Sequence, residues 1–182
     1  MVYAFLATGL EEVECLGVVD ILRRGGVEVK LVSVTGEMLV MGSHHITMQA
    51  DALIEDVDFA QAELLFLPGG VPGTPNLAAC EMLCEQLKAF AAEGKGMAAI
   101  CAAPSVLGQL GLLEGKQATC YPGWEEQLTG ATVVGDGVVT DGNVTTARGL
   151  GYAIDLGLEL VRRLKGAELA QEIQDAIQYN YQ

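Results

Sequence analysis

Residues 97–104, which read MAAICAAP, decide how this chain folds. The apolar segment that ends at Ile100 predicts a buried strand, and Pro104 begins a helical pattern. Cys101 lies at the corner between the two, where small neighbours permit a sharp turn. Turns of this kind, called nucleophile elbows, place a reactive side chain at the edge of a sheet. We therefore expect a strand, a tight turn and a helix, with the Cys101 sulfur projecting from the turn.

Two interpretations of Cys101 stay open on the local sequence alone. The partial positive charge of a helix N-terminus favours a thiolate, so the elbow predicts a pKa for Cys101 below that of a free cysteine. A cysteine among alanines can equally be a small buried apolar residue, as most free cysteines are.

Strands and helices alternate on both sides of the elbow. The pattern predicts main strands over residues 2–7, 27–34, 63–67 and 96–100, with a short hairpin over 39–48 and short strands over 118–120, 132–134, 138–140 and 144–147. It predicts helices over residues 10–24, 82–92, 104–110, 152–164 and 167–177. Such alternation indicates one α/β domain over residues 1–182, with a mostly parallel sheet and helices on both faces. Sites in such domains lie beyond the carboxyl ends of the strands.

The composition indicates a cytoplasmic globular protein. Of its 182 residues 51% are hydrophobic, and no apolar run reaches the roughly 20 residues that span a bilayer. Five cysteines without framework spacing, and a first strand without a preceding signal-peptide pattern, indicate a reducing compartment. A net charge of −14, with no basic patch to neutralise phosphates, disfavours nucleic acid as a partner. We expect binding neither to nucleic acid nor to membranes.

Three segments are predicted to meet at the carboxyl edge of the sheet: residues 8–14, residues 68–70 and the elbow. Gly69 and Gly70 let the backbone approach closely and turn N–H groups toward an oxyanion or a carboxylate. Glycine pairs also form ordinary tight turns, so this interpretation stays open.

The acidic residues of the first segment divide into two kinds. Glu11 and Glu12 fall in the first helical turn, where acidic side chains favour the helix dipole and are expected to stay solvated. Glu14 is followed by small and apolar residues three, four and seven positions later, which predicts that its side chain is buried. A buried carboxyl group tends to keep its proton and can donate it in a hydrogen bond to a thiolate. We therefore expect Glu14 to be the proton partner of Cys101.

Residues 9–14, 68–70 and 99–104 together make the chain similar to the ThiJ/PfpI superfamily. The resemblance is to its parkinsonism-associated (DJ-one) and bacterial YajL-like branch, and it covers almost the whole chain. It implies a flavodoxin-like sandwich of the class I glutamine amidotransferase type, working without a cofactor.

The resemblance implies roles for four residues at the predicted site. Cys101 is expected to be the nucleophile and Glu14 its hydrogen-bonding acid. The N–H groups of Gly70 and Ala102 are expected to bind an oxyanion. Four further pocket candidates are Gly69, Tyr121, Arg148 and His44.

Similar proteins are homodimers whose first helices pack together. The resemblance therefore implies a homodimer, with Asp20 and Arg24 as candidate interface residues. Their four-residue spacing equally allows an ion pair within one helix.

One position departs from the family pattern. Many relatives carry a histidine two residues after the position of Thr119, where this chain has Tyr121. A phenol with a pKa near 10 is a poor base at neutral pH, which disfavours Cys–His catalysis. His44 and His45 fall in the predicted hairpin, where similar proteins sometimes carry an arginine near an anion site. Exposed loop histidines are the simpler interpretation, and they predict no metal site. Arg148 either binds an anion near a helix start or caps a turn.

Two functions from different classes follow. The first is a cofactor-independent enzyme of the glyoxalase or deglycase type, acting on methylglyoxal or its early adducts. In it Cys101 adds to the aldehyde, and Glu14 moves protons. The alternative is a redox-sensing protective protein or chaperone in which Cys101 is oxidised to a sulfinate.

Overall fold

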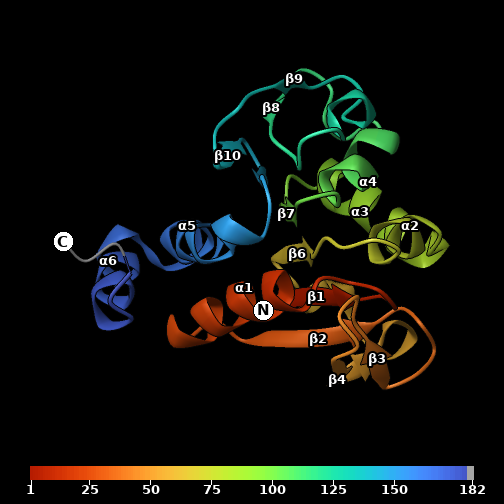
Figure 1. Ribbon diagram of the computed structural model, residues 1–182, viewed down its shortest axis with the longest axis horizontal. Coiled ribbons are helices and arrows are strands. Elements are labelled where there is room, and N and C mark those ends of the chain that lie inside the picture. Colours follow the sequence, from red (N-terminus) through yellow and green to blue (C-terminus); the bar gives the residue numbers. More distant parts are fainter. Residues whose placement is uncertain (180–182) are drawn as a thin grey trace.

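Seven strands form one sheet in the structure, a computed structural model that describes residues 1–179 (Figure 1). Their order is β10-β11-β7-β6-β1-β2-β5, and the pair β10–β11 is antiparallel whereas the other pairs are parallel. The strands are β1 (Val2–Leu6), β2 (Val29–Ser33), β5 (Ala52–Leu53), β6 (Leu64–Leu67), β7 (Gly96–Ile100), β10 (Val138–Asp141) and β11 (Val144–Ala147). The predicted mostly parallel sheet is confirmed.

The chain changes direction across the sheet at β1. It first adds β2 and β5 on one side of β1, and then returns to add β6, β7 and β11 on the other. Because parallel strands end at the same edge, the loops after β1, β6 and β7 are neighbours at this switch point. Ligands of open α/β sheets bind at such points.

Helices cover both faces of the sheet (Figure 1). One face carries α1 (Glu12–Arg24) and α5 (Ala153–Lys165), with α6 (Ala167–Ala176) packed on α5. The other face carries α2 (Gly73–Ala78), α3 (Glu81–Ala92) and α4 (Pro104–Gln109). Successive residues of β1 enter opposite cores, as expected for a strand that is buried on both sides.

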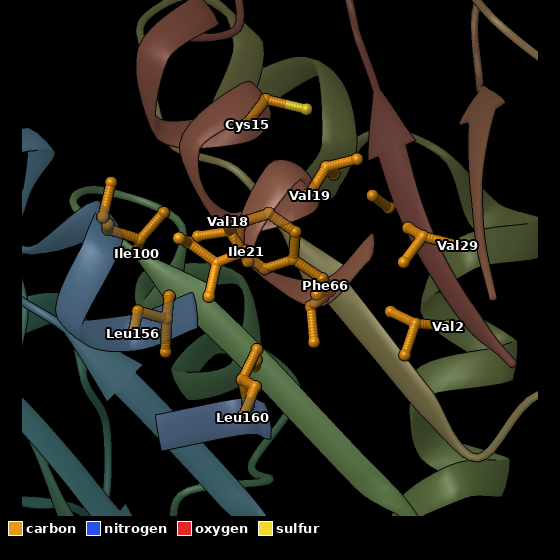
Figure 2. Close-up of a cluster of buried hydrophobic side chains, with 14 of the residues drawn as sticks. Val2, Cys15, Val18, Val19, Ile21, Val29, Phe66, Ile100, Leu156 and Leu160 are labelled. Carbon is orange, nitrogen blue, oxygen red and sulfur yellow. The ribbon is translucent and has the colours of Figure 1, made fainter. Parts of the chain in front are cut away.

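Figure 2 shows the core between α1, α5 and the sheet. Val18 and Ile21 of α1 pack with Leu156 of α5, and Phe66 and Ile100 close the core from the sheet. These apolar positions on α1 are three residues apart, so one helix face is buried while Glu14 stays on the same side at its N-terminal end.

Four shorter strands and four 3-10 helices complete the described chain. The predicted hairpin is formed by β3 (Leu39–Met41) and β4 (Thr47–Gln49), and β8 (Gln117–Ala118) pairs in parallel with β9 (Thr132–Val133). The 3-10 helices are η1 (Ile54–Asp56), η2 (Phe59–Gln61), η3 (Glu125–Gln127) and η4 (Leu150–Tyr152). Across residues 1–179, no helix combines the length and the apolar character that crossing a membrane requires.

The sequence did not predict α2 or β5, and it placed the start of α1 too early. Pro75 reads as a helix breaker, yet it lies in the first turn of α2, where its missing N–H has no helical partner. α1 begins at Glu12, because the N–H of Leu10 donates to the carbonyl of Ala7 in a turn.

Gly157 allows α1 and α5 to approach closely. A Cβ atom added there would lie 2.7 Å from the Cβ of Ile21. We expect Gly157→Ala to lower the free energy of unfolding by about 1–3 kcal/mol through overpacking, which outweighs a gain in helix propensity of about 1 kcal/mol. Urea denaturation measures the change. Gly135→Ala is the control, since nothing lies within 4 Å of a Cβ built there, and equal stability of wild type and Gly157→Ala would contradict this packing.

Candidate active site

The backbone turns sharply at Cys101, where φ is 64°, a conformation that non-glycine residues rarely adopt. Two backbone hydrogen bonds hold the turn. The N–H of Cys101 donates to the carbonyl of Ala147 at 2.9 Å, and the carbonyl of Cys101 accepts from the N–H of Tyr121 at 2.8 Å. The residue is partly exposed, while Ala102 and Ala103 behind it are buried. The structure therefore has the elbow that residues 97–104 predict.

Glu14 reaches the elbow from the first turn of α1, and its side chain is only 1% exposed. Its Oε2 accepts a hydrogen bond from the N–H of Gly69 at 3.1 Å. The carboxyl group is also hydrogen-bonded to the thiol of Cys101 and to the backbone N–H of Leu150. The predicted burial of Glu14 and its pairing with Cys101 are both present in the structure.

Gly69 fills the space between the acid and the thiol. A Cβ atom at Gly69 would lie 2.6 Å from the Cβ of Cys101 and would also clash with Oε2 of Glu14. Gly70 has φ of 93°, which favours glycine. The backbone N–H groups of Gly70 and Ala102 donate hydrogen bonds to the Cys101 sulfur. An oxyanion formed next to the sulfur would meet the same two donors.

Burial controls the protonation of this pair. Burial raises the pKa of the Cys101 thiol above its ordinary value, and the charge of Glu14 raises it further. The N–H groups of Ala102 and Gly70 lower it, but by less. The expectation of a low thiol pKa is therefore wrong, because the elbow acts in the predicted direction and is outweighed by desolvation and a neighbouring carboxylate.

Burial also raises the pKa of Glu14 to about 7, and the charge of Glu11 acts in the same direction. Hydrogen bonds from Cys101, Gly69 and Leu150 oppose the shift. A carboxyl group with this pKa can accept or donate a proton near neutral pH, as a general acid–base catalyst must. Glu14 can therefore take the proton of a thiol that does not ionise readily by itself.

The expected solvation of Glu11 and Glu12 is wrong, since both side chains are buried. Glu11 accepts from the N–H of Glu14 at 2.6 Å and so caps α1. Glu12 accepts from the backbone N–H of His44 at 2.7 Å, and its Oε2 lies 2.9 Å from Nδ1 of His44. Burial by itself would raise the pKa of Glu12, but the hydrogen bonds from His44 and from backbone N–H groups lower it to about 2. Glu12 anchors the β3–β4 hairpin to α1 as a carboxylate.

Glu11, Glu12 and His44 each place a possible metal-ligand atom within 4.8 Å of the others. The Glu12 carboxylate already accepts N–H donors from the hairpin, so this arrangement is sufficiently explained as a contact between α1 and the hairpin. The His44 side chain is 68% exposed, in line with a histidine of a surface loop.

Tyr121 and Arg148 border the elbow. Tyr121 binds Cys101 through its backbone N–H, and its ring packs on Gly149. Arg148 follows Ala147, the residue whose carbonyl holds the elbow, and its guanidinium donates to the carbonyl of Gly135 at 3.1 Å. This contact fits the interpretation that Arg148 braces a turn.

Asp20 and Arg24 form an ion pair of 2.6 Å within α1, the second of the two interpretations of their spacing. Their role in a homodimer stays a prediction. Among the remaining cysteines, Cys15 and Cys120 are buried, whereas Cys80 and Cys84 at the start of α3 are partly exposed.

Two contributors to the site were not predicted. The Glu11 carboxylate holds the backbone at Glu14, and an acid three residues before Glu14 was a signal for this cap. The N–H of Leu150 binds Glu14 from a loop about 140 residues away, and a backbone donor at that distance leaves no mark in side-chain patterns.

We expect Glu14→Gln to be more stable than the wild type at pH 8. The folded pKa of Glu14, about 7, lies above the roughly 4.3 of an unfolded chain, so stability present at low pH is lost as pH rises through 7. Removing the charge should raise the free energy of unfolding by about 3–4 kcal/mol at pH 8, and by less at pH 5.5. Urea denaturation at both pH values tests this. Glu12→Gln is the control, and should instead be destabilised; a less stable Glu14→Gln at pH 8 would refute the assignment.

The chain is 41% identical over 170 residues to Protein DJ-1 homolog B of Arabidopsis thaliana, covering 92% of this chain and 39% of that protein. The chain thus spans about two fifths of the length of its Arabidopsis relatives.

A second relative, the glutathione-independent glyoxalase DJR-1.2 of Caenorhabditis elegans, is 32% identical over 160 residues, covering 87% of this chain and 84% of the relative. The solved structure of oxidized Toxoplasma gondii DJ-1 superposes with a TM-score of 0.94 at 34% identity, covering 99% of this chain and 98% of that one. The profile of the DJ-1/PfpI family matches residues 1–163. With its elbow cysteine and buried glutamate in place, this chain belongs to the DJ-1/PfpI family.

Proposed function

We propose that this protein is a cofactor-independent glyoxalase that converts methylglyoxal, or its early adducts on thiols and amines, to a lactate-level product. The observation that carries the proposal is the hydrogen bond between the Cys101 thiol and the buried Glu14 carboxyl, at a point where two backbone N–H groups face the sulfur. The relative DJR-1.2, named as a glutathione-independent glyoxalase, supports it.

The reaction is an internal redox rearrangement followed by hydrolysis. Glu14 takes the thiol proton as the Cys101 sulfur bonds to the aldehyde carbon of the substrate. The oxygen of the resulting hemithioacetal lies against the N–H groups of Gly70 and Ala102. Moving a proton from this carbon to the neighbouring one, through an enediolate, gives a lactoyl thioester. Water then cleaves the carbon–sulfur bond, which releases lactate and restores the thiol.

Glu14 carries every proton transfer in this scheme, since Tyr121 stands where many relatives have a histidine. A carboxylate with a pKa of about 7 is a suitable base for this purpose. Because the Cys101 pKa is raised, the thiolate forms only as Glu14 accepts its proton. The scheme therefore requires ionised Glu14 for the attack and protonated Glu14 for the later steps.

We expect purified protein without glutathione to consume methylglyoxal and form lactate, and Cys101→Ser to be inactive. Glu14→Gln should lose at least about 100-fold in kcat/KM, the usual contribution of a general acid–base. In the wild type kcat/KM should rise with pH through about 7 as Glu14 ionises, and this limb should be absent in Glu14→Gln. Lactate assays between pH 5.5 and 9 measure both effects.

Glu81→Gln, an exposed acid at the start of α3, is the control and should retain wild-type activity. Full activity of Glu14→Gln would exclude the mechanism. Equal lactate formation by the wild type and Cys101→Ser would exclude the enzyme.

A second candidate function is redox sensing at Cys101, and one observation favours it. A carboxyl group that is protonated near neutral pH, together with two N–H donors, surrounds the sulfur with groups that bind sulfinate oxygens. The structure of the Toxoplasma relative is described as oxidized. Hydrogen peroxide would oxidise the Cys101 thiolate to a sulfenate with release of water, and a second peroxide would give the sulfinate.

We expect mild peroxide to add two oxygens selectively at Cys101, as measured by intact-mass and peptide mass spectrometry. Cys15 and Cys120 are buried, so they should react more slowly. Glu14→Gln should slow the reaction because it removes the base. Oxidation of Cys80 and Cys84 at the rate of Cys101 would count against a sensing role.

A further inference from the structure

A cavity of about 320 Å³ lies between two loops that adjoin the elbow in the structure. Its walls come from two loops, residues 121–122 and residues 148–152. The side chains that it exposes are mainly apolar: Tyr121 is 51% exposed, Leu150 48% and Tyr152 39%. Large apolar side chains gathered around one hollow indicate a binding surface rather than scattered surface residues.

Both loops are bonded to the reacting pair. The N–H of Tyr121 donates to the carbonyl of Cys101. The N–H of Leu150 is hydrogen-bonded to Glu14. Arg148 follows the residue that accepts from the N–H of Cys101. The two loops that line the cavity are therefore bonded directly to both members of the reacting pair.

The walls are held in place by close contacts with glycine. The ring of Tyr152 packs so tightly on Gly137 that an added Cβ would clash with it. The ring of Tyr121 lies on Gly149, where an added Cβ would be 3.3 Å from Cδ2. Two rings seated on backbone form a preorganised surface, which loses little entropy when a ligand binds.

The size of the cavity exceeds what methylglyoxal requires. A cavity of about 150 Å³ suffices to bind benzene in a protein interior, so a methyl substituent would leave most of this space unfilled. A ring or a branched alkyl group would cover the exposed faces of Leu150 and Tyr152.

We propose that this cavity is the subsite for the substituent of the carbonyl substrate, and that the enzyme prefers 2-oxoaldehydes with an aryl or long alkyl group to methylglyoxal. The inference rests on the proposed function and extends it to the substrate class. Leu150 and Tyr152 are the specificity-determining side chains, and they act on the group remote from the reacting carbons.

Steady-state kinetics with phenylglyoxal and methylglyoxal test the subsite. The wild type should favour phenylglyoxal in kcat/KM by on the order of tenfold, the discrimination that extra apolar groups give in a fitted pocket. Tyr152→Ala should lose most of this preference while keeping its activity on methylglyoxal, because Tyr152 contacts neither Cys101 nor Glu14 through any bond described above. Leu150→Ser should lose the preference as well. Met82→Ser, a change of similar character on an exposed position of α3, is the control. Unchanged selectivity in both variants would overturn the inference.

A measurement without turnover separates this inference from the proposed function. Phenacyl bromide and bromoacetone alkylate Cys101 by forming a carbon–sulfur bond and releasing bromide, with loss of the thiol proton. The rate of alkylation by each reagent is measured by intact mass. It is then divided by the rate at which the same reagent alkylates N-acetylcysteine. If the wild type still prefers phenacyl bromide after this correction, and Leu150→Ser prefers it less, the result supports the subsite. This holds even if no lactate forms. A ratio equal to that of the free thiol, as expected if a second copy of the chain covers the cavity, would refute it.

Discussion

The missing side chain at Gly69 is the constraint on which the site depends. Glu14 and Cys101 come from opposite sides of the switch point, and the backbone of Gly69 lies between them. Its N–H binds the carboxylate, while the space that a Cβ would occupy is taken by Glu14 and Cys101. Any other residue would push the acid away from the thiol. The hydrogen bond between them therefore depends on the absence of a side chain at position 69.

Two carboxyl groups on the same turn of α1 have opposite effects: ionised Glu14 destabilises the fold at high pH, whereas ionised Glu12 stabilises it. Burying Glu14 opposes its ionisation, whereas Glu12 is charged and held by N–H donors of the hairpin. The two carboxyl groups differ by two positions in sequence, yet their pKa values are moved in opposite directions by what surrounds them. Environments that separate the proton affinities of neighbouring acids are typical of acid–base sites.

Much of this arrangement could be predicted from the sequence. The elbow, the parallel sheet and the burial of Glu14 follow from local pattern, because each depends on neighbouring residues in the chain. The pKa of Cys101 could not be predicted, since it depends on how much solvent the folded chain removes and on a charge brought in from α1. The burial of Glu12 was missed for the same reason: the hairpin that covers it lies about 30 residues further on. The pairing of Glu14 with Cys101 could be predicted because the order of the strands brings both residues to one edge of the sheet. The solvent and charges that other elements remove or bring to these side chains could not be predicted.

The strand β11 also has a consequence for synthesis of the chain. The backbone N–H of Cys101 donates a hydrogen bond to the carbonyl of Ala147, the last residue of β11. Glu14, the acid partner of Cys101, is synthesised long before Ala147. Domains made on the ribosome grow from the N-terminus, so a nascent chain has its acid, its glycine loop and its thiol before the strand that fixes the elbow has emerged. The reactive geometry is thereby completed only after residue 147 has been translated.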